Sequence, residues 1–282
     1  MTERRTDAET EPGWNVNRAP AGFERIDLHE VWRFRELALV LAQRDLKVRY
    51  KQTAFGIAWV VIQPLAAVLI FSVVFGHVAH LSSGGVPYPV FVYSGLVLWT
   101  YFSGTLDSVA QSLVQNRDLV TKTYFPALVA PLALLLPGLA DLLVSLAVVG
   151  VVMGAYGVAP GVAVVLLPVW IALCVLVVLA AGSWLAALNV QYRDVRHTLT
   201  FLIQMWLFAS PVVYTSGLVD GRWRYVYALN PMAAVLDGFR WSLIDGPAPS
   251  AYDLVSLLAG VLLLAGGLLY FARAERRFAD LI

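Results

Sequence analysis

Charged residues are scarce in this sequence of 282 residues, and it contains one cysteine. Asp, Glu, Lys and Arg make up 14% of the chain, about half the share that globular domains carry. Hydrophobic residues make up 59%, and the mean hydropathy is +0.71. This composition excludes intrinsic disorder and a soluble enzyme with a solvated surface. The single Cys174 excludes an intrachain disulfide framework, and the net charge of +1 does not indicate a nucleic-acid partner.

The shortage of charge is concentrated in long intervals. Residues 52–106 and 142–192 contain no Asp, Glu, Lys or Arg. Because about 20 apolar residues cross a bilayer, each interval is long enough for two membrane-spanning helices. Glycine and proline interrupt the first interval at 77–89 and the second at 154–161, where turns are expected. Two shorter uncharged intervals follow, each long enough for one helix.

We therefore predict an all-α polytopic membrane protein with six transmembrane helices. An even number of spans puts both termini on one side, and this side carries seventeen of the twenty Lys and Arg residues. Since Lys and Arg favour the cytoplasmic side, both termini are predicted to be cytoplasmic. Residues 1–29 are expected to form a mobile cytoplasmic tail, and residues 30–282 the transmembrane domain. The spans are expected at about 57–76, 90–110, 127–153, 162–189, 198–218 and 252–272.

Residues 30–51 are predicted to form a helix that lies on the membrane. Phe34, Leu37, Leu41 and Val48 recur at helical spacing, and basic residues form a second stripe. A basic amphipathic helix before a first span sits at the headgroup layer. It is either a simple anchor or a helix beside a pore entrance. Its charged and polar residues crowd the membrane boundary at Arg44, Asp45, Lys47, Arg49 and Tyr50.

Two other segments outside the spans have unusual sequences. The loop 111–126 mixes polar and apolar residues, so it is either an ordinary connector or a short helix that docks a partner. The external segment 220–250 is too apolar for a free loop. Its Asn230-Pro231 pair is typical of a helix start, with Asn as the cap and Pro in the first turn. We expect two short helices in the outer leaflet here, as a gate or as an aromatic belt.

Two carboxylates fall inside predicted spans, where acids are costly and are candidates for function. Asp107 lies near the cytoplasmic end of its span. Asp141 lies nearer the middle, and a hydrogen bond to a Ser or Tyr of a neighbouring helix is the simplest expectation. One deep acid is too little to indicate proton coupling.

Recognisable catalytic chemistry is missing from the sequence. It contains no Walker phosphate loop, no metal-binding motif, and no nucleophile paired with a base. We therefore expect no catalytic residue and no metal site in this chain, and any energy for work must come from another protein.

Several motifs together resemble the ABC-2-type permeases that export cell-surface polysaccharides, the O-antigen and teichoic acid exporters. The resemblance runs in order from residue 30 to residue 282. Phe55 departs from it, since a smaller aliphatic residue is expected there. The motifs are Arg44–Trp59 with Gln63-Pro64, Asn116–Lys122 with Phe125-Pro126, Tyr192–Val195, Ser210–Tyr214, Leu229–Pro231 with Phe239-Arg240, and a tail with Phe271, Glu275 and Phe278–Asp280.

This resemblance implies a homodimer of six-span subunits in the bacterial inner membrane, with two copies of a separate ABC ATPase bound on the cytoplasmic face. It implies the ABC-2 (type V exporter) fold, a lipid-linked glycan as substrate, and ATP and Mg on the partner rather than a cofactor in this chain. By resemblance, Asn116, Arg117, Asp118 and Lys122 belong to the helix that couples to the ATPase. The helix at 30–51 lies beside the substrate entrance. The external gate includes Asn230, Pro231, Asp237, Phe239 and Arg240.

A path for sugars is expected to offer aromatic rings that pack on the apolar faces of pyranoses. An aromatic residue in a span more often packs on lipid or on another helix, and this alternative stays open for each one. We hypothesise that Arg117 and Lys122 contact the ATPase, and that Arg44, Lys47 and Arg49 meet the lipid pyrophosphate. The candidate pore-lining residues are Trp59, Tyr93, Trp99, Phe102, Trp206, Phe208 and Tyr214.

Three alternatives remain at this point. An ABC-2-type exporter of a drug or small lipid shares the fold. A membrane-embedded glycosyl- or acyltransferase requires clustered acids or histidines, which the sequence lacks. A passive channel needs no docking helix for an ATPase.

Overall fold

A computed structural model describes most of the chain. In this part of the sequence all regular secondary structure is helical, which confirms the all-α prediction. Most of the predicted tail 1–29 lies outside the described residues, and so does the predicted start of the first span at residue 57. The described residues are 28–51, 58–123, 125–192, 194–275 and 278.

Four helical segments are long and apolar enough to cross a membrane. The first runs from Val61 to Val78, where α3 (Ala58–Phe71) continues into the π-helical η1 (Ser72–Val78). The second is α6 (Val129–Ala155). In the third, Val162–Gln191, the 3-10 turn η2 (Val162–Leu166) leads into α7 (Leu167–Gln191). The fourth is α11 (Ala251–Glu275). The protein is therefore a multi-pass membrane protein.

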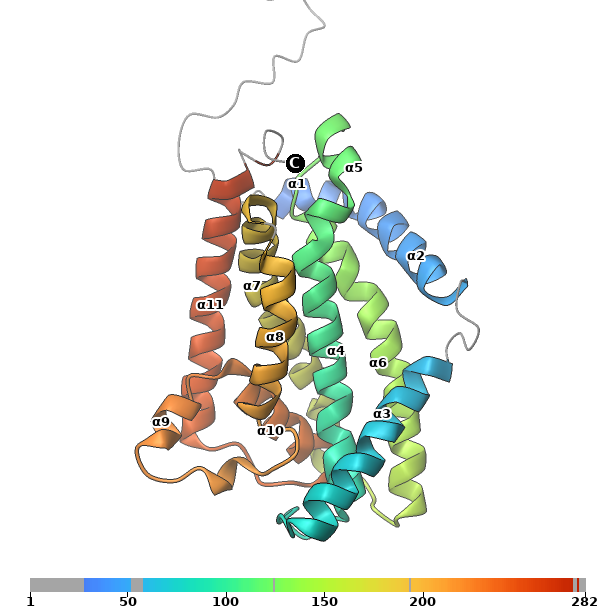
Figure 1. Cartoon of the computed structure of the whole chain (residues 1–282), viewed down its shortest axis with the longest axis vertical. Coiled ribbons are helices and arrows are strands. Elements are labelled where there is room, and N and C mark those ends of the chain that lie inside the picture. The colour runs from blue at the N-terminus through green and yellow to red at the C-terminus, as the bar shows by residue number, and fades with distance from the viewer. Residues whose placement is uncertain (1–27, 52–57, 124, 193, 276–277, 279–282) are drawn as a thin grey trace, which may run out of the picture.

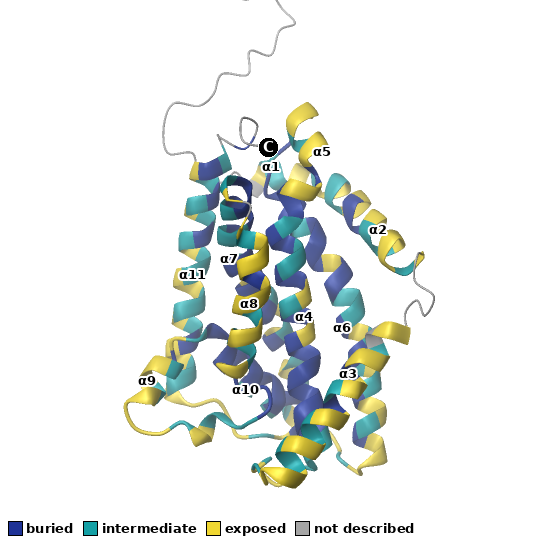
Figure 2. Cartoon of the chain, viewed as in Figure 1, coloured by how far each residue is buried: buried dark blue, intermediate teal, exposed yellow. Residues whose placement is uncertain are grey.

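The helix α4 (Tyr88–Gln115) forms the centre of the bundle, although it is not among these four. It packs against α6 and α7 (Figure 1). Its sequence is rich in Ser, Thr, Gly, Tyr and Trp, which lowers its hydropathy, and most of its surface is covered by other helices (Figure 2). Because neighbouring helices rather than lipid surround α4, it needs less apolar surface than a lipid-facing span.

The helix α8 (Val195–Phe208) is shorter than the span expected at 198–218. Pro211 explains the early end, because the residue before a proline is pushed out of the helical conformation. The chain then turns back through the 3-10 turn η3 (Ser216–Leu218) and the short helix α9 (Trp223–Tyr227) into α10 (Pro231–Ile244). The two short helices expected in 220–250 are confirmed as helices.

The other end of the bundle carries α1 (Leu28–Arg33), α2 (Arg35–Lys51) and α5 (Arg117–Lys122). The surface helix predicted over 30–51 is thus broken into α1 and α2 at Phe34. A small apolar core beneath it joins Phe34 and Leu37 to α4 and to the end of α11. Val48 belongs to the exposed face of α2, with 56% of its surface exposed.

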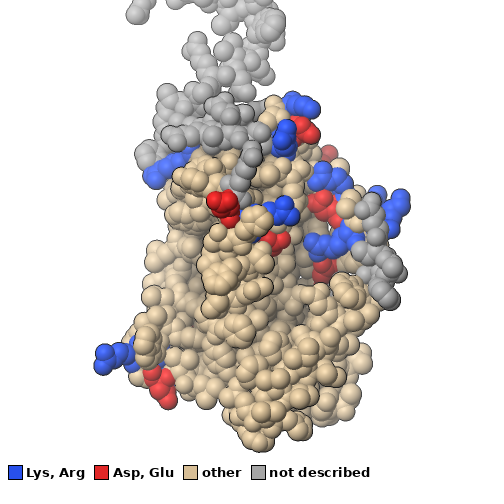
Figure 3. Space-filling view, in the orientation of Figure 1, with Lys and Arg blue, Asp and Glu red and all other residues tan. Residues whose placement is uncertain are grey.

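Charged side chains are unevenly distributed over the face shown in Figure 3. Most lie at the end of the bundle that carries α2, α5 and the upper ends of α8 and α11, and a second small group lies by α9. The broad surface between these two groups is free of charge on this face, as a lipid-facing surface requires. The end of the bundle that carries α1, α2 and α5 is called the α5 end, and the opposite end, which carries α9, is called the α9 end.

Candidate functional site

The candidate site lies where the surface helix α2 meets α6. Arg49, near the end of α2, forms an ion pair with Asp141 on α6. The hydroxyl of the next residue, Tyr50, donates a hydrogen bond to the other Asp141 oxygen. The expectation that Asp141 bonds to a Ser or Tyr of a neighbouring helix is confirmed. Since an isolated carboxylate inside a span is costly, these two partners account for the acid in the middle of α6.

A cavity of about 380 Å³ opens beside this ion pair, and we call it the α2–α6 cavity. Its size falls within the roughly 300–1,000 Å³ typical of small-molecule sites. Helices α2, α3, α4 and α6 all contribute polar side chains to its wall, and two aromatic rings besides that of Tyr50 stand beside them. The polar residues, apart from Arg49, Tyr50 and Asp141, are Gln63, Thr100, Ser103, Thr105 and Ser145, and the rings are those of Trp59 and Tyr101.

A close approach of α4 and α6 fixes one wall of the cavity. A Cβ atom at Gly138 of α6 would lie 2.2 Å from Oγ1 of Thr105 and 3.0 Å from the ring of Tyr101. Only glycine therefore lets the two helices pack this closely, as small residues do at many membrane helix contacts. The positions of Thr105 and Tyr101 in the wall depend on this contact.

The same surface helix is also tied to the loop that leads into α5. The guanidinium of Arg44 donates a hydrogen bond of 2.8 Å to the amide oxygen of Asn116, between α4 and α5. The amide nitrogen of Asn116 donates to the Ser112 carbonyl, also at 2.8 Å, so the acceptor is held in place. Arg44 forms an ion pair with Asp45 at 3.1 Å as well. One helix thus contacts the α5 loop through Arg44 and the α2–α6 cavity through Arg49.

The short helix α5 stands at the tip of the bundle, and Arg117, Asp118 and Lys122 are exposed on it (Figure 2). Lys122 and Asp118 lie 3.5 Å apart within the helix, and both side chains are more than 70% exposed. Such a pair contributes little to stability, so these charges are available to another protein.

At the α9 end, Asn230 joins α8 to α10. Its side-chain oxygen accepts from the backbone of Met232 at 3.0 Å, which confirms the predicted cap. The same oxygen accepts the indole hydrogen of Trp206 at 2.8 Å. Its nitrogen donates to the Ala209 carbonyl at 3.0 Å and to the Ser210 hydroxyl at 2.9 Å. Pro231 follows in the first turn of α10, so the end of α8 is attached to the start of α10.

Arg240 makes a second attachment from α10. It is 3% exposed and donates to the carbonyls of Pro211 and Val212, in the segment that follows the end of α8. Burial lowers the pKa of Arg240 to about 10, so it stays charged at neutral pH. Phe239 beside it is fully buried. The residues predicted for an external gate therefore belong to the packed part of the protein at this end.

Asp237 lies on the same helix and is partly buried. Burial raises its pKa to about 6, while a hydrogen bond from Ser216 and the charge of Arg240 oppose the rise. Its environment therefore disfavours the ionised carboxylate.

The seven candidate pore-lining aromatics fall into two groups. Tyr93, Trp99 and Phe102 are buried in the main core of the subunit, at most 5% exposed, so they have no access to a path along its surface in this conformation. Trp206 packs edge-on against Phe102 at 5.0 Å between centroids and is held by Asn230. Trp206 and the remaining three, which are Trp59, Phe208 and Tyr214, reach the surface at least partly.

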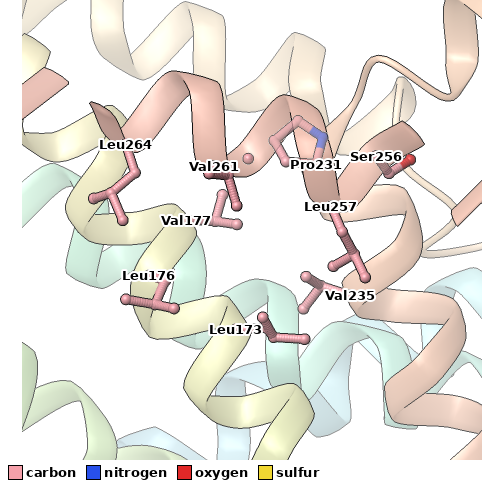
Figure 4. Close-up of a pocket in the computed structure, with 10 residues that line it drawn as sticks. Leu173, Leu176, Val177, Pro231, Val235, Ser256, Leu257, Val261 and Leu264 are labelled. Atoms are coloured by element: carbon pink, nitrogen blue, oxygen red, sulfur yellow. The ribbon is translucent and has the colours of Figure 1, made fainter. Parts of the chain in front are cut away.

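A second pocket lies between α7, α10 and α11, and Figure 4 shows the apolar side chains that surround it. Its volume is about 40 Å³. The hydroxyl of Ser256, at one end, is used in a hydrogen bond of 2.8 Å to the Ala228 carbonyl. This pocket is too small and too apolar for a sugar. Among the described residues there is also no group of His, Cys, Asp and Glu that suits a metal.

Sequence reasoning singled out Arg49, Tyr50, Trp59 and Asp141 but missed most of the rest of the cavity wall. A signal for the α6 wall was present in the sequence. Gly138, Asp141 and Ser145 stand at steps of three and four, so they share one face of a helix. A stripe of small and polar residues on one face of an apolar span marks a face that does not meet lipid.

The sequence was then compared with known proteins. Residues 36–244 match the ABC-2 type transporter family. An O-antigen export system permease protein, RfbA of Myxococcus xanthus, is 32% identical over 259 residues, which is 90% of this chain and 98% of that protein. The protein of the same name from Klebsiella pneumoniae is 26% identical over 88% of this chain and 95% of its own length. A polysialic acid transport protein of Escherichia coli, KpsM, is 26% identical over 27% of this chain.

A multi-pass helical bundle with a short exposed helix at one end and a polar cavity at its side defines the class as a membrane transport protein. The family match covers well over half of the sequence, and the chain belongs to the ABC-2 type transporter family.

Proposed function

We propose that this chain is the permease subunit of an ATP-driven ABC exporter that moves a lipid-linked cell-surface polysaccharide out of the cytoplasm. The observation that carries the proposal is the identity of 32% with an O-antigen export permease, which extends over 90% of the chain. An O-antigen, a teichoic acid or a similar glycan would be the substrate. The relatives that match along the chain are named as polysaccharide permeases, which favours this substrate over a drug or a small lipid.

The proposal includes an assembly. Two copies of the chain form the conduit, and two copies of a separate ABC ATPase bind at the α5 end. ATP and Mg are held by the ATPase, and the permease contributes no cofactor and no catalytic residue. The subunit spans the bacterial inner membrane six times, with α4 and α8 as the additional spans. Both termini and the α5 end face the cytoplasm, and the α9 end forms the external gate.

The contacts of α2 support a route for coupling. Arg117 and Lys122 on α5 contact the ATPase, and a movement of α5 passes to α2 through Asn116 and Arg44. Because α2 also carries Arg49, this movement reaches the α2–α6 cavity. The glycan then passes between the protomers, along Trp59, Phe208 and Tyr214, and leaves beneath α9 and α10.

Deletion of the gene tests the transport function. The deletion strain should accumulate a lipid-linked glycan in the cytoplasm and lose it from the cell surface, and the wild-type gene should restore export. An unchanged surface glycan, with no accumulation inside, would overturn the proposal.

Point substitutions test the coupling route. Arg44→Met should reduce export severalfold because the bond to Asn116 is lost, and Arg44→Lys should recover part of it. Co-purification with the ATPase should persist in both variants. Arg35→Met is the matched control, since Arg35 lies on α2 and, within the described residues, interacts with Trp32, whose carbonyl accepts at 3.4 Å and whose ring centroid lies 5.5 Å away. Equal export by the Arg44→Met and Arg35→Met variants would exclude Arg44 from the route.

A further inference from the structure

The partners of Asp141 are unusual for an acid in the middle of a span, because both come from the surface helix α2. Arg49 and Asp141 are held together, yet their side chains are 39% and 20% exposed. Both groups border the α2–α6 cavity. Because the pair faces the cavity and Tyr50 also holds the carboxylate, another anion that enters the cavity can compete with Asp141 for Arg49 without leaving the acid unpartnered.

The guanidinium of Arg49 is suited to such an exchange. Its planar fork of donors binds phosphate as well as it binds carboxylate, and a diphosphate that links a lipid to a sugar carries about two negative charges against the one on Asp141. Lys47, two residues earlier on α2, adds positive charge at the exposed face of the helix. A phosphate that approaches along the membrane surface therefore meets Arg49 at the edge of the cavity.

The remainder of the cavity suits the group next to the phosphate. Trp59, 54% exposed, offers a ring surface, and Gln63 and Thr100 offer exposed hydrogen-bonding groups. This combination fits a sugar ring, whose faces are apolar and whose edge carries hydroxyls. A volume of about 380 Å³ leaves room for one or two sugar units rather than a long chain.

We propose that the α2–α6 cavity binds the phosphate-linked end of the glycan, and that Asp141 competes with the substrate phosphate for Arg49. The inference rests on the proposed function, because it takes the substrate to be a glycan attached to a lipid phosphate. When the substrate enters, the phosphate replaces the Asp141 carboxylate on Arg49. When the substrate leaves, Asp141 takes Arg49 back. Tyr50 holds the carboxylate in place throughout.

The competition has a physical consequence for transport. Asp141 stands beside the bound phosphate and repels it, so the carboxylate weakens binding. A conduit needs binding that is favourable enough for entry and weak enough for release. Removing the carboxylate should therefore raise affinity and slow release, whereas removing Arg49 should lower affinity.

The test measures binding of a long-chain polyprenyl diphosphate to the full chain in nanodiscs. Asp141→Asn keeps an acceptor for Tyr50 and removes the charge. It should bind the lipid about fivefold more tightly than the wild type, because no carboxylate then competes with the lipid phosphate for Arg49. Arg49→Gln should bind about tenfold more weakly, and the double variant should be as weak as Arg49→Gln alone. Asp107→Asn is the matched control, since Asp107 lies on α4, outside the wall of this cavity, and accepts a bond from Gln111.

The arms of the experiment identify the source of the phosphate. Inorganic pyrophosphate and phosphatidylglycerol are measured alongside the polyprenyl diphosphate. If Asp141→Asn binds the polyprenyl diphosphate more tightly than the wild type, and this gain in affinity requires Arg49, the competition is supported. Affinities for the other two probes show whether free pyrophosphate or another lipid phosphate competes with Asp141 in the same way. No gain at Asp141→Asn, or a gain that persists without Arg49, overturns it.

A second measurement keeps Asp141 and follows the distance between α2 and α6. Spin labels at Leu39→Cys on α2 and Leu143→Cys on α6, in a Cys174→Ala background, report the separation of the two helices. Leu39 and Leu143 are 48% and 66% exposed, so both accept a label. The polyprenyl diphosphate should shift the measured distance in the native Arg49 background and not in Arg49→Gln. Binding without a shift overturns the exchange. Failure of the proposed function is distinct, because it would appear as normal surface glycan in the deletion strain.

Discussion

The guanidinium carbon of Arg240 lies 3.9 Å from the centroid of the Phe91 ring, and this contact joins α10 to α4. The same group donates to the carbonyls of Pro211 and Val212, in the segment that follows the end of α8. One buried cation therefore connects three elements at the α9 end. A buried charge is tolerated here because acceptors and a ring face surround it.

Arg240→Met is expected to destabilise the protein by about 2–4 kcal/mol, because two carbonyls lose their charged donor and the ring contact is lost. The stability of Arg240→Lys should lie between those of Arg240→Met and the wild type, because the Lys ammonium keeps the charge but lacks the planar fork that reaches both carbonyls. Thermal unfolding in detergent measures the effect. Arg222→Met, at an exposed position of the same segment, should change stability by less than about 0.5 kcal/mol. Equal effects at the two positions would contradict this role for Arg240.

Gly138→Ala tests the wall of the α2–α6 cavity. The added methyl group would lie 2.2 Å from Oγ1 of Thr105, so α4 and α6 must separate, at a cost of about 1–3 kcal/mol. Gly150→Ala on the same helix meets nothing within 4 Å and should be neutral or stabilising by up to about 1 kcal/mol. The two variants are compared by thermal unfolding. If Gly138→Ala were as stable as Gly150→Ala, the close contact would not exist in the protein.

Asn230 and Trp206 are expected to act as a pair. Asn230→Ala removes the cap of α10, worth about 1 kcal/mol, and leaves the Trp206 indole without its acceptor, at a further cost of about 1–3 kcal/mol. Trp206→Phe keeps a ring against Phe102 and removes the donor. A double-mutant cycle should give a coupling energy of about 0.5–3 kcal/mol between the two positions. Additive effects in the cycle would show that the hydrogen bond does not join α8 to α10.

The helical architecture could be predicted from the distribution of charge, because apolar length and the breaks between apolar intervals are local properties. The cap at Asn230 was also predictable, since a cap depends on two neighbouring residues. The end of α8 at Phe208 was not predicted. Pro211 signals it, but the apolar run continues past the proline, and nothing local shows that Arg240 holds the segment after α8.

The candidate site was predictable only in part. The basic residues of α2 stand out in the sequence, whereas the contact from Arg49 to Asp141 joins residues that are 92 positions apart. Nothing local in the sequence pairs them. The burial of Tyr93, Trp99 and Phe102 was equally hidden, because an aromatic residue in an apolar span looks the same whether it faces a path or the core.

Asp237 gives the protein a stability that depends on pH. Its pKa is raised from 3.8 to about 6, mainly by burial, so folding favours the protonated carboxyl. The nearby charges are Arg240 and Arg224, which lower the pKa, and Asp253, which raises it. The protonated Asp237 carboxyl stabilises the folded state fully when the pH is below 3.8, the pKa of the group in the unfolded chain. This stabilisation is lost as the pH rises through about 6, the pKa in the folded protein. The wild type should therefore lose at most about 3 kcal/mol between about pH 4 and pH 8 through this group.

Asp237→Asn removes that loss, because the amide is neutral at every pH and still accepts a hydrogen bond from Ser216. The variant should melt at a higher temperature than the wild type at about pH 8, and the difference should shrink towards about pH 4. Thermal unfolding across this range in the same detergent measures it. Asp220→Asn is the control, since Asp220 is exposed, and its curve should follow that of the wild type. If the curves of Asp237→Asn and the wild type ran parallel across the range, the buried carboxyl would not titrate near pH 6, because a titrating group must bend one curve away from the other.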